Sequence, residues 1–153
     1  AYCSISKRSD LGLFEKFCSD IGYSPRTFTS YDSKGGIVYH TNVMMSIGDD
    51  FILVCLQSIV DEDERKKVKE SIESTGRNII EIGLKQMESF AGNLLQLGEP
   101  GNKVIVISQS AFKSLTYNQK QILSSESKIV NIPIPVIQKC GGGSVRCMIA
   151  ELL

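Results

Sequence analysis

The chain has 153 residues, and its 17 basic side chains balance its 17 acidic ones. This length is enough for a single domain, residues 1–153, with a hydrophobic core of its own. A nucleic-acid-binding protein would carry a basic excess on one face, which the charge balance argues against. The longest apolar run, residues 51–56, is far too short to span a bilayer. We therefore expect neither nucleic acid nor a membrane among the partners.

The first 35 residues predict a strand, a helix and a second strand, in that order. The strands are expected over residues 2–5 and 26–31. The helix is expected from about Asp10 to Ile21. Its apolar stripe, at helical spacing, consists of Leu13, Phe14, Phe17 and Ile21.

The next segment predicts two strands, a helix and a third strand. The first two strands, over residues 37–47 and 51–59, are joined by a Gly-Asp-Asp turn and so form a hairpin. Asp61 caps the helix, whose first turn is acidic and whose later turns are basic, as the helix dipole favours. Residues 78–82 form the closing strand.

A later segment predicts the same order of elements again. Strands are expected over residues 94–97 and 103–108, around a Gly-Glu-Pro-Gly turn. Thr116 and Gln119 have the spacing of a capping box, which indicates the start of the helix. A closing strand is expected over residues 128–134.

Three polar residues mark a repeat. Asn42, Asn93 and Ser144 lie 51 residues apart, and a fixed period of this size indicates a repeated supersecondary unit. The expected fold is α/β, a partial propeller of strand-strand-helix-strand units. Its parts are a partial unit 1–35, units 37–82 and 94–134, and a last front strand 145–152. A chain that begins and ends within a unit fits either part of a longer protein or a ring closed by pairing its two ends.

The five cysteines are Cys3, Cys18, Cys55, Cys140 and Cys147. Their spacing fits no zinc site, and no histidine lies near them in sequence. The first three fall among apolar residues, so we predict buried free thiols in a reducing compartment, the cytoplasm. The last two flank a run of three glycines.

A second pattern concerns the centre of the repeats. Units arranged around an axis gather matching strand ends near that axis. His40 and Cys147 lie near the starts of two front strands, so they could meet there despite their separation in sequence. Such a pair suits nucleophilic catalysis with a general acid/base. The residue types alone leave open a core histidine and a structural thiol.

Four residues are candidates for binding a substrate at this centre. Asn42 and Asn93 occupy equivalent positions of the repeat. Gly142 and Gly143 precede Cys147 and would let a ligand approach the main chain closely. A flexible turn is the alternative interpretation of the glycines. No residue is predicted to bind a metal.

Three stretches carry a resemblance to a known superfamily, and together the likeness covers the whole chain. They are Tyr39-His40-Thr41-Asn42-Val43-Met44-Met45, Phe90-Ala91-Gly92-Asn93 and Gly141-Gly142-Gly143-Ser144-Val145-Arg146-Cys147-Met148-Ile149-Ala150-Glu151. The chain resembles the guanidine-modifying (pentein) superfamily, which includes arginine deiminases, dimethylarginine hydrolases and amidinotransferases. It looks most similar to the amidinotransferase-like branch associated with citrulline utilisation. The resemblance implies a propeller of five units around a central active site.

The resemblance also implies roles for individual residues. Cys147 would be the nucleophile and His40 the general acid/base of a hydrolase or amidinotransferase. The thiolate would attack the carbon of a small guanidine substrate, and the covalent amidino-cysteine intermediate would pass to water or to another amine. No metal or organic cofactor is implied. Arginine deiminases carry Asp where Asn42 stands, and an amide forms a weaker hydrogen bond to a guanidinium than a carboxylate does.

No segment matches the amino-terminal half of the family, which holds further guanidinium-binding carboxylates. That half, or a partner chain, is therefore an expected partner, with a homo-oligomer as one option, and activity is expected to be incomplete in this chain alone. Two other hypotheses stay open. The chain could be a non-catalytic binding module that buries its sheet edges against another chain. It could also be an α/β domain in which Cys147 is structural.

Overall fold

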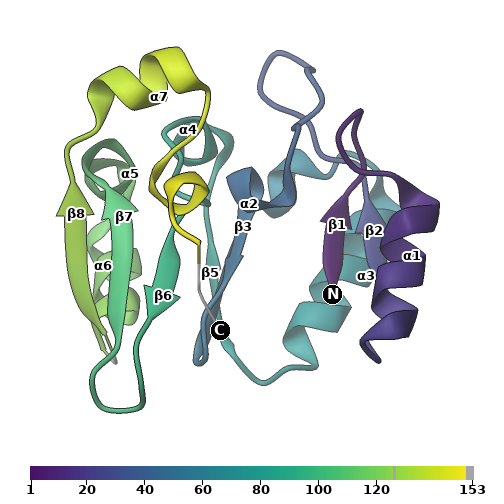
Figure 1. Cartoon of the computed structure of the whole chain (residues 1–153), viewed down its shortest axis with the longest axis horizontal. Coiled ribbons are helices and arrows are strands. Elements are labelled where there is room, and N and C mark those ends of the chain that lie inside the picture. The colour runs from purple at the N-terminus through teal and green to yellow at the C-terminus, as the bar shows by residue number, and fades with distance from the viewer. Residues whose placement is uncertain (126, 151–153) are drawn as a thin grey trace.

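The structure is a computed structural model and describes residues 1–125 and 127–150. Three small β-sheets stand side by side, with helices packed around them (Figure 1). The predicted α/β class is therefore confirmed. The propeller and the size of its repeat stay predictions.

The first sheet contains two parallel strands, β1 (Tyr2–Ser4) and β2 (Arg26–Phe28), connected by helix α1 (Leu11–Asp20). Asp10 caps α1 by accepting a hydrogen bond from the amide of Leu13 at 2.8 Å. The predicted order of strand, helix and strand is confirmed, although both strands are shorter than expected.

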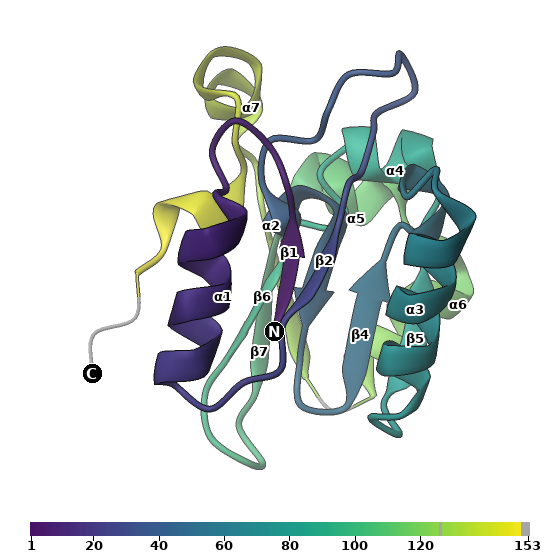
Figure 2. The ribbon, with the colours of Figure 1, turned by 90° about the vertical axis from the view of Figure 1, so that its right-hand side faces the viewer.

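Helix α1 packs differently from the prediction. Its buried residue is Cys18, while Leu13 is 69% exposed and Phe17 is 54% exposed. Residues four apart share a helix face, so the half-buried Phe14 and the buried Cys18 form the inward face of α1. Of the predicted stripe, only Phe14 lies on this face. Figure 2 shows β1 and β2 between α1 and α3 (Glu62–Glu73), with α1 at the margin of the molecule. Among the residues that the structure describes, none covers the outer face of α1.

The second sheet contains β3 (Met45–Ile47), β4 (Phe51–Val54) and β5 (Asn78–Glu81) in that order. Strand β3 is antiparallel to β4, and β4 is parallel to β5. Helix α3 connects the parallel pair, and its cap Asp61 accepts from the amide of Glu64 at 2.9 Å. All four residues of β4 are buried, so this strand lies in the core.

The third sheet has the same order and polarity. Its strands are β6 (Leu95–Leu97), β7 (Val104–Ser108) and β8 (Lys128–Ile132). Helices α5 (Gln109–Ser114) and α6 (Tyr117–Ser124) connect β7 to β8, and α6 begins with the predicted capping box. The predicted order of strand, strand, helix and strand is therefore confirmed in both sheets. Strands β3 and β6 lie next to each other, which joins the two units at their front strands.

Two predicted strands are interrupted by helical turns. Residues 37–47 form β3 only over the last three positions, because α2 (Thr41–Met44) makes one helical turn, closed by a bond from the amide of Met45 to the carbonyl of Thr41. Residues 51–59 end as a strand at Val54 and continue as the 3₁₀ turn η1 (Leu56–Ser58). Residues 43–46 and 51–56 are buried, and a short buried stretch has no periodicity that separates strand from helix.

The segment from Pro135 onward also differs from the prediction. Helix α7 (Pro135–Gly141) takes in Cys140 and the first glycine, with proline in its first turn and Gly142 in the left-handed conformation at its end (φ 63°). The predicted strand 145–152 is instead the 3₁₀ turn η2 (Val145–Met148), closed by a bond from the amide of Cys147 to the carbonyl of Ser144. Residues 151 and 152 of that prediction lie outside the described residues.

The burial of the cysteines and the set of helices can also be compared with the predictions. Cys3, Cys18 and Cys55 are buried and free, as predicted, and Cys140 and Cys147 are exposed and free. Burial raises the pKa of the Cys55 thiol, which keeps it in its neutral form. Two short helices, α4 (Leu84–Glu88) and α5, were not predicted. No helix within residues 1–125 and 127–150 is long and apolar enough to cross a membrane.

Candidate active site

The candidate site is built where η2 meets the segments that precede β3 and β6. Figure 1 shows η2 between β6 and α2, and η2 also packs against β7. Ser144 and Val145 anchor the turn in the interior, whereas Cys147 is exposed. The turn thus presents the thiol of Cys147 at the surface from a buried base.

Asn93 braces this arrangement. Its side chain is fully buried, and its Nδ2 donates to the carbonyl of Asn42 at 3.0 Å and to the sulfur of Cys147 at 3.3 Å. Its Oδ1 accepts from the amide of Arg146 at 3.1 Å. One side chain therefore ties the segment before β3 to the turn that carries Cys147.

The side chain of Asn42, at the equivalent repeat position, forms fewer hydrogen bonds than that of Asn93. Its Nδ2 lies 4.0 Å from the sulfur of Cys147. Its Oδ1 is buried and has no hydrogen-bond partner, a state shared with the hydroxyl of Ser46 alone among buried side-chain polar atoms of the described residues. A buried acceptor without a partner is costly, so this oxygen needs a hydrogen-bond donor that the described residues do not supply.

The glycines make close backbone contacts at the site. A Cβ on Gly143 would lie 3.3 Å from the Cβ of Cys147 and 3.4 Å from its sulfur. A Cβ on Gly92 would lie 2.3 Å from the carbonyl oxygen of Val43, which real Cβ atoms do not approach so closely. Glycine at these two positions lets the three segments come together.

His40 contacts its neighbour Tyr39, which in turn contacts the glycine run before Cys147. The two rings meet edge to face, with centroids 5.0 Å apart and an interplanar angle of 62°. The Tyr39 hydroxyl donates to the carbonyl of Gly142. The pKa of Tyr39 is raised, first by burial and then by negative charge on Cys147, while Arg8 acts in the opposite direction. No hydrogen bond joins His40 to Cys147 among the residues that the structure describes.

A groove extends from the site between β1 and β3. It has a volume of about 460 Å³, and its lining includes Asn42, Ser46, Arg77 and Arg146. Both unpartnered polar atoms therefore belong to residues that line this groove.

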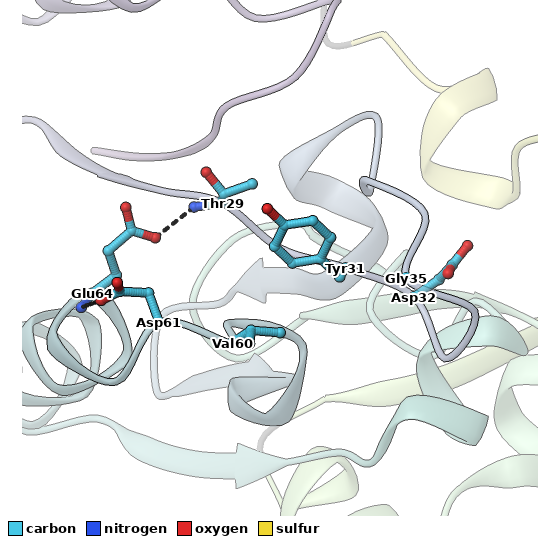
Figure 3. A pocket seen from close by; sticks show the side chains of 7 residues that line it. All are labelled: Thr29, Tyr31, Asp32, Gly35, Val60, Asp61 and Glu64. Atoms are coloured by element: carbon cyan, nitrogen blue, oxygen red, sulfur yellow. Dashed lines mark hydrogen bonds between the residues drawn. The ribbon is translucent and has the colours of Figure 1, made fainter.

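A hollow of about 620 Å³ lies elsewhere, between β2 and the start of α3 (Figure 3). Its carboxylates are engaged locally: Glu64 accepts from the amide of Thr29 at 2.8 Å, Asp61 caps α3, and Asp32 accepts from the amide of Gly36 at 2.7 Å. Within residues 1–125 and 127–150, no three His, Cys, Asp or Glu side chains are grouped so as to hold a metal ion. None of the predicted site residues lines this hollow.

The match of a family model, together with the fold, places the chain in the guanidine-modifying pentein superfamily, which confirms the resemblance seen in the sequence. The family described as N,N dimethylarginine dimethylhydrolase, eukaryotic, has a sequence model that matches residues 1–153. The chain therefore belongs to this family, whereas the sequence resemblance pointed to the amidinotransferase-like branch. A comparison with curated proteins finds no match.

Solved structures share the fold. Apo ArgZ, described as an arginine dihydrolase from the ornithine-ammonia cycle in cyanobacteria, matches with a TM-score of 0.72 at 13% identity, over 96% of this chain and 21% of that chain. The product-bound N-terminal domain of ArgZ matches with a TM-score of 0.73 at 14% identity, over 96% and 49%. C. jejuni agmatine deiminase matches with a TM-score of 0.51 at 15% identity, over 93% and 46%. The chain thus spans less than half the length of each of these proteins.

Sequence reasoning missed two residues of the site. Tyr39 precedes His40 in one of the stretches that carried the resemblance. No sequence pattern, however, assigns a role to a tyrosine next to a candidate acid/base. Ser46 lies within a strand, where a serine is unremarkable until its burial is known. Asn42, Asn93 and Gly143 do lie against Cys147, whereas Gly142 is turned toward Tyr39.

Proposed function

We propose that the protein carrying this chain hydrolyses a C–N bond of a guanidinium group, with Cys147 as the nucleophile and His40 as the general acid/base. The observation that supports this most directly is the approach of two amide groups, those of Asn93 and Asn42, to one exposed thiol. Membership of a family of dimethylarginine dimethylhydrolases supports the substrate class, an arginine-type compound with a methylated guanidinium.

The first step forms a carbon–sulfur bond. The Cys147 thiolate attacks the guanidinium carbon, and the electrons of one C–N bond leave with the amine nitrogen, which takes a proton from His40. The amide N–H groups of Asn93 and Asn42 point toward the sulfur, where negative charge resides before the attack. The products of this step are a free amine and an amidino group on sulfur.

The second step returns the enzyme to its starting state. His40, now neutral, takes a proton from water, and the resulting hydroxide attacks the amidino carbon. The C–S bond breaks, and its electrons return to the sulfur of Cys147. The proton of the added hydroxyl passes to solvent, and the substrate leaves with oxygen in place of nitrogen, as a urea. A second amine in place of water would give the transfer reaction instead.

The unpartnered Oδ1 of Asn42 supports the binding of a guanidinium at this place. A guanidinium presents a planar fork of N–H donors and no acceptors, so a buried acceptor beside the nucleophile is complementary to it. We assign Asn42 the role of orienting the guanidinium toward Cys147. Asn93 holds the turn that carries the thiol, as its three hydrogen bonds favour.

Labelling with 2-chloroacetamidine, whose amidine mimics a guanidinium, tests the proposal. Cys140 is the matched control, because it is the second exposed free thiol of the chain. We expect the ratio of labelling at Cys147 to labelling at Cys140 to be at least about tenfold higher with chloroacetamidine than with iodoacetamide. Peptide mass spectrometry measures both ratios in one sample.

Equal ratios for the two reagents would contradict a guanidinium site at Cys147. Turnover of N,N-dimethylarginine and arginine, followed by amine release, then identifies the substrate. Cys147→Ser is expected to abolish this release while Cys140→Ser leaves it unchanged. Adding a second amine separates transfer from hydrolysis, since only transfer yields a new guanidine compound.

The exposed face of α1 favours one further function, that of a module that binds another polypeptide. Leu13, Phe17 and Ile21 lie at four-residue intervals on this helix and are all exposed. A continuous apolar stripe of this kind commonly marks an interaction surface. Size-exclusion chromatography with light scattering tests this function: self-association that Leu13→Glu abolishes is expected, and a monomer at all concentrations would contradict binding to a second copy.

A further inference from the structure

Tyr39 makes contacts on both sides of the candidate site. Its hydroxyl donates to the carbonyl of Gly142, a residue 103 positions away. Its ring supports the imidazole of His40 at a centroid distance of 5.0 Å. Tyr39 therefore touches the segment of the acid/base and the segment of the nucleophile at the same time.

The tyrosine is itself held in place. The carbonyl of Tyr39 accepts a hydrogen bond of 2.8 Å from the hydroxyl of Ser6. The guanidinium carbon of Arg8 lies 5.2 Å from the centroid of the ring, within the range of a cation–π contact. The hydrogen bond restricts the backbone of Tyr39, and the cation–π contact restricts the rotation of its ring. The hydroxyl therefore points in one direction.

The contact with Gly142 acts directly on the nucleophile. Gly142 ends α7 in the left-handed conformation and is followed by Gly143, where an added Cβ would lie only 3.3 Å from the Cβ of Cys147. A shift of the Gly142 carbonyl therefore moves the backbone that lies against the thiol. Burial keeps Tyr39 neutral by raising its pKa, so its hydroxyl stays a hydrogen-bond donor through the neutral range.

We propose that Tyr39 is the positioning residue of the site, which sets the spacing between the imidazole of His40 and the thiol of Cys147. Its hydroxyl fixes the turn before Cys147, and its ring fixes the orientation of His40. This role deepens the function proposed above and rests on it, because positioning has a catalytic consequence only if His40 and Cys147 react together.

Two substitutions separate the two contacts. Tyr39→Phe removes the hydroxyl and keeps the ring, while Tyr39→Leu removes both. Tyr2→Phe is the matched control, because the Tyr2 hydroxyl forms a long-range hydrogen bond of 3.0 Å with Ser71 on α3. The control thus loses a tyrosine hydroxyl contact of the same kind at another place in the fold.

Amide hydrogen exchange, measured on the whole chain, tests the hydrogen bond from the Tyr39 hydroxyl to the Gly142 carbonyl. We expect the amides of residues 141–147 to exchange about fivefold to tenfold faster in Tyr39→Phe, as the loss of one hydrogen bond predicts, and unchanged in Tyr2→Phe. Unchanged exchange of this segment in Tyr39→Phe would overturn the proposal. This readout needs no turnover, so it remains valid even if the proposed reaction is wrong.

Proton NMR tests the packing of the Tyr39 ring against the imidazole of His40. Because His40 is the only histidine, its two imidazole C–H signals are unambiguous. We expect these signals to be retained in Tyr39→Phe and shifted in Tyr39→Leu, where the neighbouring ring is lost. Signals that are the same in wild type and Tyr39→Leu would overturn the role of the ring, and with it the proposal.

The kinetic signature of positioning is a fall in kcat with little change in KM. We expect kcat to fall about tenfold in Tyr39→Phe, with KM within about twofold of wild type. A rise in KM at constant kcat would make Tyr39 a binding residue and would overturn the positioning role. A wild-type protein without turnover would count against the proposed function, while exchange and NMR would still decide the placement of the two segments.

Discussion

The segments that precede β3 and β6 show how one repeat position serves two purposes. Asn93 is fully buried, and each polar atom of its side chain has a partner. Asn42 has the same side chain 51 residues earlier, but its Oδ1 is unpartnered and its Nδ2 is 4.0 Å from the nearest partner. One asparagine ties the segments together, and the other leaves its side-chain oxygen without a hydrogen-bond partner.

The two segments also depend on each other. Gly92 packs against the backbone of Val43 and Met44, and Asn93 binds the carbonyl of Asn42. The later segment therefore contacts the backbone of the earlier one, while the side-chain oxygen of Asn42 has no hydrogen-bond partner. This asymmetry predicts that changes near β6 lower stability, whereas changes near β3 lower activity.

Gly92→Ala is expected to have the largest effect. The new Cβ would lie 2.3 Å from the carbonyl oxygen of Val43, so the two backbones must separate. We expect the free energy of unfolding to fall by about 3 kcal/mol or more, measured by urea denaturation. Gly12→Ala in α1 is the control, where the added Cβ meets only an ordinary contact at 3.6 Å and the higher helix propensity of alanine is expected to stabilise by up to about 1 kcal/mol. A Gly92→Ala protein as stable as wild type would refute the close contact.

The pair Asn93→Ala and Asn42→Ala tests the comparison directly. Asn93→Ala leaves the amide of Arg146 and the carbonyl of Asn42 without partners, and we expect a loss of about 2 kcal/mol in the free energy of unfolding. Asn42→Ala removes an acceptor that is already unpaired, so its stability should stay within about 0.5 kcal/mol of wild type.

Turnover is expected to separate the same two variants. Asn42→Ala should lose about tenfold or more in kcat/KM, since one hydrogen bond to a charged group is removed. Asn42→Asp sharpens the test, because a charge-assisted hydrogen bond to a guanidinium should lower KM. Equal losses of stability in Asn93→Ala and Asn42→Ala would break the comparison.

The smallest expected effect is a dependence of stability on alkaline pH. Cys55, whose amide binds the carbonyl of Met44, and Tyr39 both flank the segment before β3, and burial raises the pKa of each. Both groups are neutral when protonated, so a folded pKa above the unfolded one adds stability at neutral pH that is lost as the pH rises.

We therefore expect the free energy of unfolding to decline above about pH 9, where unfolded thiols begin to ionise. Denaturation curves at a series of pH values measure this decline. It should be shallower in Cys55→Ala and unchanged in Cys140→Ala, whose thiol is exposed. A flat profile from pH 8 to pH 10 in wild type would contradict the prediction.

Local signals made much of the fold predictable. The caps Asp10, Asp61 and Thr116 each satisfy free amides at a helix start, and all three act as the sequence indicates. The order of strands and helices followed from these caps and from the turns between apolar runs. Elements without such signals were missed, such as α4, or assigned to strands, such as the single turn α2, whose second half is buried and apolar.

The site was predictable only in part. Cys147, Asn42 and Asn93 could be named because a period in the sequence relates the last two, and the glycine run points to the first. Tyr39 could not, since its role depends on a hydrogen bond to Gly142 that spans most of the chain. The strand predicted at Cys147 is a 3₁₀ turn because the amide of Arg146 is bound by Asn93 instead of by a neighbouring strand.

The sequence by itself determined the α/β class, the repeated order of elements and the identity of the nucleophile candidate, because caps, turns and periods act over a few residues. The tertiary structure alone decided which asparagine is a brace and which remains free, and it brought Tyr39 between His40 and the turn of Cys147. The physical reason is that satisfying a buried polar group depends on which atoms lie around it, and those atoms come from segments about 50 to 100 residues away.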